Sequence, residues 1–182
     1  AVASGDLPPV AERLPDEPLV VDGVDGIGQY GGQWRRLASR PTDGANFLRI
    51  VGYEPLVRWT PDGSGVEPNV AHDWNVNDDA TEYTFYLREG LKWSDGVPFT
   101  SADIMFWYED IVLNEELTPT IPGYLVNGDQ VAKVTAPDDY TVVFSFADTN
   151  GTFLRTLASP NGAALDPTFY ARHYFEQYHI AY

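Results

Sequence analysis

Three side chains of the kinds that bind zinc lie close together near the end of the chain, at His173, Glu176 and His179. On a helix His179 lies about 120° round the axis from His173, whereas a zinc-protease helix places its two histidines four residues apart on one face. The aromatic neighbours Tyr174 and Tyr178 favour a packed helix with the histidines at its polar edges. We therefore expect no metal site and no cofactor.

Hydrolytic chemistry is a second interpretation, because Ser94 and Asp95 share the chain with His72. The sequence contains no Gly-x-Ser-x-Gly turn and no recognisable oxyanion segment. A glycosidase needs two carboxylates facing one cleft, and 27 acidic residues make some such pair unavoidable without making it meaningful. Our prediction is that the chain is not an enzyme, with a carboxylate-dependent hydrolase as an alternative.

Composition excludes several classes of function. A formal net charge of −16 with only 11 Lys and Arg residues argues against nucleic acid and against anionic membrane surfaces. The absence of cysteine excludes disulfides, thiolate metal sites and cysteine nucleophiles. The start at Ala1 lacks the features of a signal peptide, and no apolar run approaches 18 residues. These observations predict a processed, soluble chain.

The elements are most clearly predicted between Thr81 and Tyr108. Alternation of apolar and polar side chains over residues 83–88 predicts a strand with one buried face. A turn at residues 93–96 follows, in which glycine supplies a positive φ. Thr100 and Asp103 then form a capping box at the start of a helix.

Further elements can be placed on both sides of that stretch. Alternating runs at Val131–Thr135 and Tyr140–Phe146 predict a hairpin that pairs with the 83–88 strand. A short helix is expected through Ala158, and Asp166 followed by proline predicts the start of the last helix. Four prolines, at positions 8, 9, 15 and 18, predict an extended N-terminal arm. Residues 33–38 are expected to form a strand.

Several further segments also look like segments of one protein family, and they occur in the same order along the chain. They are Gly28–Trp34, Tyr53–Val57, Glu67–Trp74, Asp139–Val142 and His173–His179. Together with residues 81–108 they resemble the family 5 solute-binding proteins of ABC transporters, a group that includes oligopeptide-, dipeptide-, nickel- and oligosaccharide-binding proteins. The resemblance runs from about Leu7 to Tyr182.

The resemblance implies an α+β fold, the N-terminal part of a bilobed periplasmic-binding-protein-like fold of type II with the family's extra inserted domain. It implies three parts. Residues 1–45 are an N-terminal arm and the first segment of lobe I, residues 46–158 are an inserted mixed α/β domain, and residues 159–182 return into lobe I and are truncated.

Aromatic residues make up 14% of the chain, and such side chains fill cores or line ligand clefts. We expect Trp74, Trp93 and Tyr83 to lie in the core, whereas Trp34, Tyr53 and Trp107 fit either role. The resemblance places seven candidate ligand-binding residues near the cleft between the lobes. They are Gly32, Gln33, Trp34, Tyr53, Glu54, Phe106 and Trp107.

The function implied is that of the extracytoplasmic solute-binding component of an ABC importer. It would bind a peptide or an oligosaccharide by hinge closure and deliver it to the permease. We expect a monomer in the periplasm or outside the cell. The parent protein could also carry a lipid anchor. The alternative from another class is a truncated scaffold that keeps only a surface for a partner.

Overall fold

The computed structural model describes most of the 182 residues. It describes residues 4–5, 8–21, 23, 25–29, 31–33, 35, 37–44, 54–159 and 166–182. Two of the seven candidate ligand-binding residues, Trp34 and Tyr53, lie outside the described residues. In the described part of the chain, no helix combines the length and the apolar character needed to cross a membrane.

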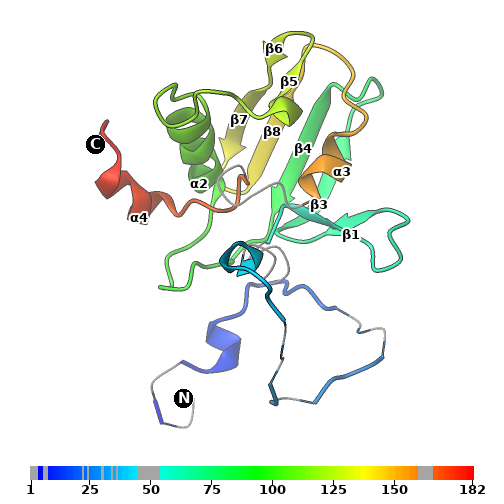
Figure 1. Cartoon of the computed structure of the whole chain (residues 1–182), viewed down its shortest axis with the longest axis vertical. Coiled ribbons are helices and arrows are strands. Elements are labelled where there is room, and N and C mark those ends of the chain that lie inside the picture. Colours follow the sequence, from blue (N-terminus) through cyan, green and yellow to red (C-terminus); the bar gives the residue numbers. More distant parts are fainter. Residues whose placement is uncertain are drawn as a thin grey trace.

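A four-stranded antiparallel sheet forms the centre of the molecule (Figure 1). Its strands, in spatial order, are β3 (Ala71–Val76), β4 (Glu82–Leu87), β8 (Thr141–Ser145) and β7 (Lys133–Asp138). The hairpin β7–β8 therefore pairs with β4 through β8, which confirms the predicted pairing.

The buried face of the sheet follows the alternation in β4. Tyr83, Phe85 and Leu87 are buried, whereas Thr84 and Tyr86 are only half-buried. Successive side chains of a strand point to opposite faces, so one face of β4 faces the core. The predicted one-sided strand is confirmed.

The boundary of β7 differs from the expected one. The strand continues to Asp138 and includes Pro137, although the sequence predicts a loop from residue 136 onwards. Proline has no backbone N–H to give to a neighbouring strand, and this is tolerated because β7 lies at the edge of the sheet. The register also shifts between Thr135 and Asp138.

The helix α2 (Ser101–Phe106) begins where the capping box predicts. The Ala102 N–H donates to Thr100 Oγ1 at 3.3 Å, and the Thr100 N–H donates to Asp103 Oδ2 at 2.9 Å. The turn before it is also confirmed, since the Gly96 N–H donates to the Trp93 carbonyl and Gly96 has a φ of +93°. The wider helical segment η3 (Trp107–Val112) continues α2 without a break.

Shorter elements complete the described structure. The hairpin β1–β2 (Val57–Trp59 and Val66–Pro68) precedes the sheet. After η3, a turn η4 (Gly123–Leu125) leads into the small hairpin β5–β6 (Val126–Asn127 and Gln130–Val131). The helix α3 (Phe153–Leu157) follows β8. Two short turns of helix lie in the N-terminal part, at η1 (Val10–Glu12) and η2 (Pro41–Asp43).

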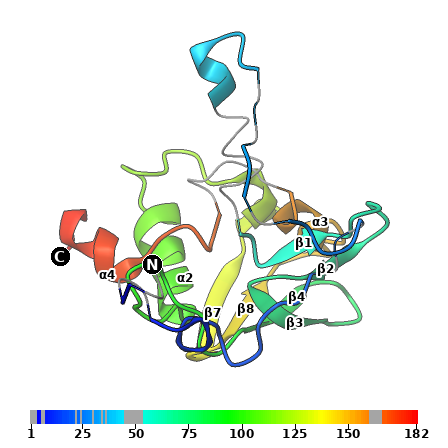
Figure 2. The same ribbon diagram turned by 90° about the horizontal axis from the view of Figure 1, so that it is seen from below.

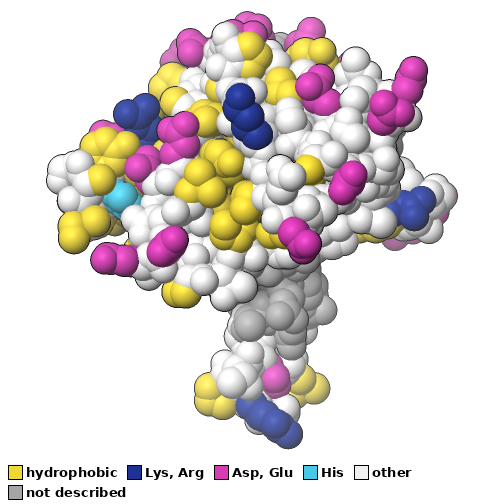
Figure 3. Space-filling view, turned by 90° about the horizontal axis from the view of Figure 1, so that it is seen from above, with side chains coloured by type: hydrophobic (Ala, Val, Ile, Leu, Met, Phe, Trp, Pro, Cys, Tyr) yellow, Lys and Arg dark blue, Asp and Glu magenta, His cyan; other side chains and the backbone are white. Residues whose placement is uncertain are grey.

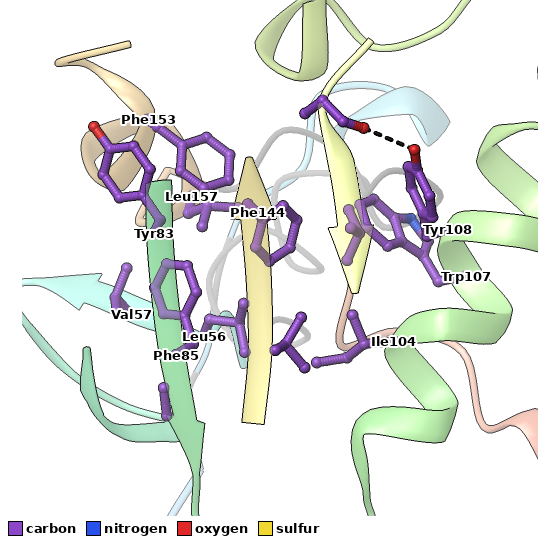
Figure 4. Packing of buried hydrophobic residues seen from close by; sticks show 14 of the residues in the cluster. Leu56, Val57, Tyr83, Phe85, Ile104, Trp107, Tyr108, Phe144, Phe153 and Leu157 are labelled. Atoms are coloured by element: carbon purple, nitrogen blue, oxygen red, sulfur yellow. Dashed lines mark hydrogen bonds between the residues drawn. The ribbon is translucent and has the colours of Figure 1, made fainter. Parts of the chain in front are cut away.

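The core fills the space between one face of the sheet and the elements α2, η3, α3 and β1 (Figure 4). Phe153 of α3 lies at the centre of an aromatic cluster. Its ring centroid lies 4.9 Å from that of Tyr83, 5.1 Å from that of Phe144 and 4.8 Å from that of Phe146. Tyr83 and Trp107 are buried, and Trp74 and Trp93 pack against the core while half-exposed.

The C-terminal segment packs against α2. It contains α4 (Arg172–Phe175) and η6 (Glu176–Tyr178). The Arg172 N–H donates to Asp103 Oδ1 at 2.9 Å, and the His173 ring lies 2.7 Å from Asp95 Oδ2. The expected helix start at Asp166 is wrong. Asp166 instead accepts the Thr168 N–H in a tight turn, and the helix begins six residues later.

The His173–Asp95 contact lowers the pKa of Asp95. The hydrogen bond from His173 is the largest cause, and the Val97 N–H adds to it. A lowered pKa in the folded state stabilises the fold above the ordinary value of 3.8, and this stabilisation is lost as the pH falls through the folded-state pKa. We expect His173→Ala to raise the pKa of Asp95 toward 3.8.

Carbon-13 NMR titration of the aspartate carboxyl groups measures this directly. Asp62 is an internal control, because its pKa of about 2 depends on Thr60 and Ser64 and not on His173. An unchanged titration of Asp95 in His173→Ala would contradict the assigned cause.

The N-terminal part runs beside this body (Figure 1). Figure 2 shows η2 standing apart from the sheet. The described residues of the segment 33–38, which are Gln33, Arg35, Leu37 and Ala38, are exposed and do not lie in a strand. The expected strand is therefore not formed in the described residues, where it has no neighbouring strand to pair with.

Candidate functional site

Gly32 and Gln33 lie on an exposed stretch of the N-terminal part. The φ angles of Gly31 and Gly32 are +107° and +89°, values that side-chain-bearing residues rarely adopt. The Gln33 side chain accepts a hydrogen bond from Arg35 at 3.3 Å. The exposed backbone here is accessible to a ligand. Its positive φ angles are not those of a β-strand, so pairing with an extended ligand requires a change to an extended conformation.

Glu54 is positioned by the buried amide of Asn69. The Asn69 side-chain N–H groups lie 3.0 Å from Glu54 Oε2 and 2.8 Å from the Pro55 carbonyl. The backbone carbonyl of Asn69 accepts a hydrogen bond from Arg88 Nε at 2.7 Å. Glu54, Asn69 and Arg88 all line a pocket of about 470 Å³. Of the predicted residues that the structure describes, Glu54 is the one that lines this pocket.

Thr168 brings the C-terminal segment to the same pocket. Its hydroxyl lies 2.7 Å from the Glu54 carbonyl and 2.6 Å from Asp166 Oδ1, and it can donate to only one of them at a time. Burial raises the pKa of Asp166, and the hydrogen bonds from Thr168 oppose that rise. A protonated Asp166 can donate to the Thr168 oxygen and release the Thr168 hydroxyl for the Glu54 carbonyl.

Phe106 and Trp107 do not present a surface to a ligand in this structure. Phe106 is 2% exposed and lies beneath the rings of His179 and Tyr182. Trp107 is fully buried and packs near Phe144. Their burial favours a role in packing α2 and η3 onto the sheet, and it argues against direct contact between these two side chains and a ligand.

The three residues with zinc-binding side chains have other partners. His173 bonds to Asp95, and the His179 Nε2 lies 3.0 Å from the Asp110 carbonyl oxygen. Glu176 pairs with Arg172 at 3.2 Å. Within the described ranges, no three His, Cys, Asp or Glu side chains gather in a way that could hold a metal ion.

The residues that suggest hydrolysis are not brought together. Ser94 lines the pocket beside Glu54, whereas His72 lines a second hollow of about 550 Å³, near the start of β3 and the end of β4. Glu89, Asp138 and Asp139 also line that hollow, and all three are exposed. An acid–base pair there would face open water, which weakens electrostatic effects on a reaction.

The charge distribution adds no concentrated site. On the face shown in Figure 3 the acidic side chains are spread over the surface and do not gather in one patch. The ion pairs among the described residues are Arg58–Glu67, Arg172–Glu176 and His173–Asp95. The net charge of −16 therefore acts as a diffuse field.

A protein-family comparison gives one match that covers most of the chain. The model described as "Bacterial extracellular solute-binding proteins, family 5 Middle" matches residues 65–179. This range includes the whole four-stranded sheet, α2 and η3, and the C-terminal segment as far as His179. The match therefore covers most of the elements that build the core, although β1 lies before it.

Curated relatives include two kinds of binding protein. The chain is 36% identical over 169 residues to the periplasmic alpha-galactoside-binding protein of Rhizobium meliloti (strain 1021), which covers 81% of this chain. It is 29% identical over 126 residues to the probable D,D-dipeptide-binding periplasmic protein DdpA of Escherichia coli (strain K12), which covers 66% of this chain. The chain spans about a quarter of the length of these relatives, at 24% and 23%.

Similar solved structures also include one protein described as peptide-binding and one in complex with an oligosaccharide. An oligopeptide-binding protein OppA is 41% identical, superposes with a TM-score of 0.86, and covers 100% of this chain with 27% of its own length. The periplasmic binding protein MelB of Agrobacterium fabrum C58, in complex with stachyose, is 29% identical with a TM-score of 0.71 and covers 99% of this chain with 29% of its own length. The chain thus has the fold of part of these periplasmic binding proteins.

Proposed function

Because this chain belongs to the family 5 bacterial extracellular solute-binding proteins, we propose that it is the N-terminal part of the extracytoplasmic component of an ABC importer. The component binds a peptide or an oligosaccharide and delivers it to the permease as a monomer. The observation that carries this proposal is the family match over residues 65–179, which covers most of the core of the described structure. The family consists of binding proteins, and the proposed role requires no covalent chemistry.

The proposed mechanism is closure of two lobes about a hinge. A ligand that makes additional contacts in the closed state shifts the equilibrium toward that state, which the permease then recognises. The chain spans about a quarter of the length of its relatives. We therefore assign most of the contacts that distinguish the closed state from the open one to the parts that the relatives have in addition.

The contacts that we assign to this chain are Gly32, Gln33, Trp34, Tyr53 and Glu54. The exposed backbone at Gly32 and Gln33 supports a role in hydrogen bonding to a ligand main chain or hydroxyl groups. Glu54 supports a role at the edge of the cleft, because its carboxylate is held by Asn69 and remains exposed.

Two ligand classes are supported by named relatives. One relative is described as alpha-galactoside-binding, and a solved neighbour is in complex with stachyose. The neighbour at 41% identity is described as oligopeptide-binding. We therefore keep both classes in the proposal and separate them by experiment.

Isothermal titration calorimetry with stachyose and with trialanine separates the classes. We expect the 182-residue chain to bind both weakly or not detectably, because we assign most of the closed-state contacts to the parts that the relatives have in addition. A chain extended to the relatives' length is expected to bind one of the two with a Kd of about 1 μM or below.

Two variants of the extended chain test the role of Glu54. Glu54→Gln should weaken ligand binding, whereas the control Asp79→Ala should leave it unchanged. Asp79 is an exposed acid in the turn between β3 and β4, far along the sequence from the candidate contacts. Tight binding of either ligand by the 182-residue chain would contradict the hinge mechanism. Binding of neither ligand by the extended chain would contradict the proposed ligand classes.

A further inference from the structure

The pocket beside Glu54 lies between the N-terminal arm, at residues 14–19, and the turn that follows β4, at residues 88–94. Its volume is about 470 Å³. The arm contributes Leu14 and Leu19 to one wall, and Leu91, Trp93 and Phe99 contribute to the other. The pocket is therefore a largely apolar space whose two walls come from segments about 75 residues apart in the sequence.

Close backbone contact fixes the distance between the arm and the turn. The Asp16 N–H donates to the Glu89 carbonyl at 3.1 Å. Gly90 has a φ of +77°, and a Cβ at this position would lie 3.1 Å from the Asp16 nitrogen and 3.3 Å from the Pro15 Cα. Glycine thus allows both the positive φ and the close approach at this point.

Two cations on the turn side hold the arm through its carbonyl oxygens. Arg88 Nη1 donates to the Glu17 carbonyl at 2.9 Å, and Lys92 Nζ donates to the Glu12 carbonyl at 3.1 Å. Both cationic side chains also line the pocket. Neither belongs to an ion pair among the described residues.

Trp93 contributes its ring to the same wall. Trp93 lines the pocket, and its ring packs against Phe99 with the centroids 5.4 Å apart. Its indole Nε1 is buried and has no hydrogen-bond partner among the described residues. A buried N–H without a partner costs about 1–3 kcal/mol, and packing of the Trp93 ring against Phe99 offsets part of this cost.

We infer that this pocket binds a small carboxylate that carries an apolar group. The carboxylate would accept hydrogen bonds at the wall formed by Arg88 and Lys92, where charge-assisted bonds are the strongest available. The apolar group would lie against the leucines and Phe99. Glu54 lines the pocket as well, and its negative charge directs the ligand's carboxylate away from its own wall.

This site shares Glu54 with the contacts proposed for the importer ligand, but its carboxylate-binding wall at Arg88 and Lys92 is not part of those contacts. The pocket has walls from two segments of this chain, whereas the importer ligand is proposed to bridge two lobes. The inference can therefore be tested with the 182-residue chain alone, and its failure would leave the proposed transport function untouched.

The test compares 4-phenylbutyrate with the uncharged 4-phenylbutyramide by isothermal titration calorimetry. The two probes share the apolar group and differ in the charge of the polar end. We expect the 182-residue chain to bind the butyrate at least about tenfold more tightly than the amide. Equal affinities would overturn the inference by reducing the pocket to an apolar hollow, and absence of binding by either probe would overturn it entirely.

A variant of one donor tests the orientation of the ligand. Lys92→Met should weaken butyrate binding about three- to tenfold and amide binding less, because it removes a donor to the carboxylate as well as the hydrogen bond to the Glu12 carbonyl that holds the arm. Lys133→Met, at an exposed lysine of β7 outside the pocket, is the matched control. Equal weakening by Lys92→Met and Lys133→Met would show general attraction of anions and would overturn the site.

Discussion

Replacing Phe153 with alanine is expected to lower the free energy of unfolding by about 3–5 kcal/mol. Phe153 is 1% exposed, and five other aromatic rings lie within 6.4 Å of its own, centroid to centroid. It also fixes α3 against the sheet, so its removal leaves a cavity that the rigid neighbouring rings cannot fill.

Urea denaturation followed by tryptophan fluorescence and by circular dichroism measures this loss. Phe169→Ala is the matched control, since Phe169 is 42% exposed and should cost less than about 1 kcal/mol when replaced. Similar losses in the two variants would show that the cluster around Phe153 is not the part of the core on which stability most depends.

Replacing Asp103 with alanine is expected to lower the free energy of unfolding by about 2–4 kcal/mol. The Asp103 carboxylate is buried and accepts two backbone N–H groups, that of Thr100 before α2 and that of Arg172 at the start of α4. Alanine leaves both donors without this acceptor. Asparagine retains one acceptor oxygen but turns an N–H toward the other donor, so Asp103→Asn should also destabilise the fold.

Hydrogen exchange distinguishes this role from a simple loss of the helix cap. The Arg172 amide should lose protection in Asp103→Ala while amides in β4 and β8 change only with global stability. Asp79→Ala is the control for removal of an exposed acid. Unchanged protection of Arg172 would show that Asp103 does not hold the C-terminal segment to α2.

The predictable part of the fold is the part encoded locally. The alternation around Phe85 and the capping box at Thr100 depend on neighbours within a few residues, and both predictions are confirmed. The Asp166–Pro167 pair follows the same local rule for a helix start, but there the Asp166 carboxylate bonds to Thr168 in a turn. A local signal of this kind permits several outcomes, and packing of the following segment selects among them.

The candidate site is harder to predict because its contacts join distant segments. Asn69, Arg88 and Lys92 are not among the seven predicted residues, although all three line the pocket beside Glu54. Arg88 binds a carbonyl 71 residues away, and no spacing in the sequence marks such a pair. The buried asparagine between a proline and an apolar residue is the one available signal, since a buried amide must find partners.

The burial of Trp107 also follows from tertiary packing. A tryptophan late in an amphipathic helical segment fits a cleft or a core equally well by sequence. In the described structure it faces Phe144 and the sheet. Which side of the helix faces the sheet depends on how α2 is fixed at Asp103, a contact that involves a residue 69 positions further on.

The N-terminal arm is held through its backbone atoms, and this determines at which positions its amino-acid sequence can vary. Arg88 and Lys92 bind main-chain oxygens of residues 17 and 12, and those oxygens are present whatever side chains occupy the two positions. Exchange of either glutamate for another non-proline residue preserves the attachment. Position 16 is different, because it supplies its N–H to Glu89 and proline has none to give. Mutational tolerance along the arm is therefore set by backbone chemistry at single positions, while position 90, across the contact, accepts only glycine without strain.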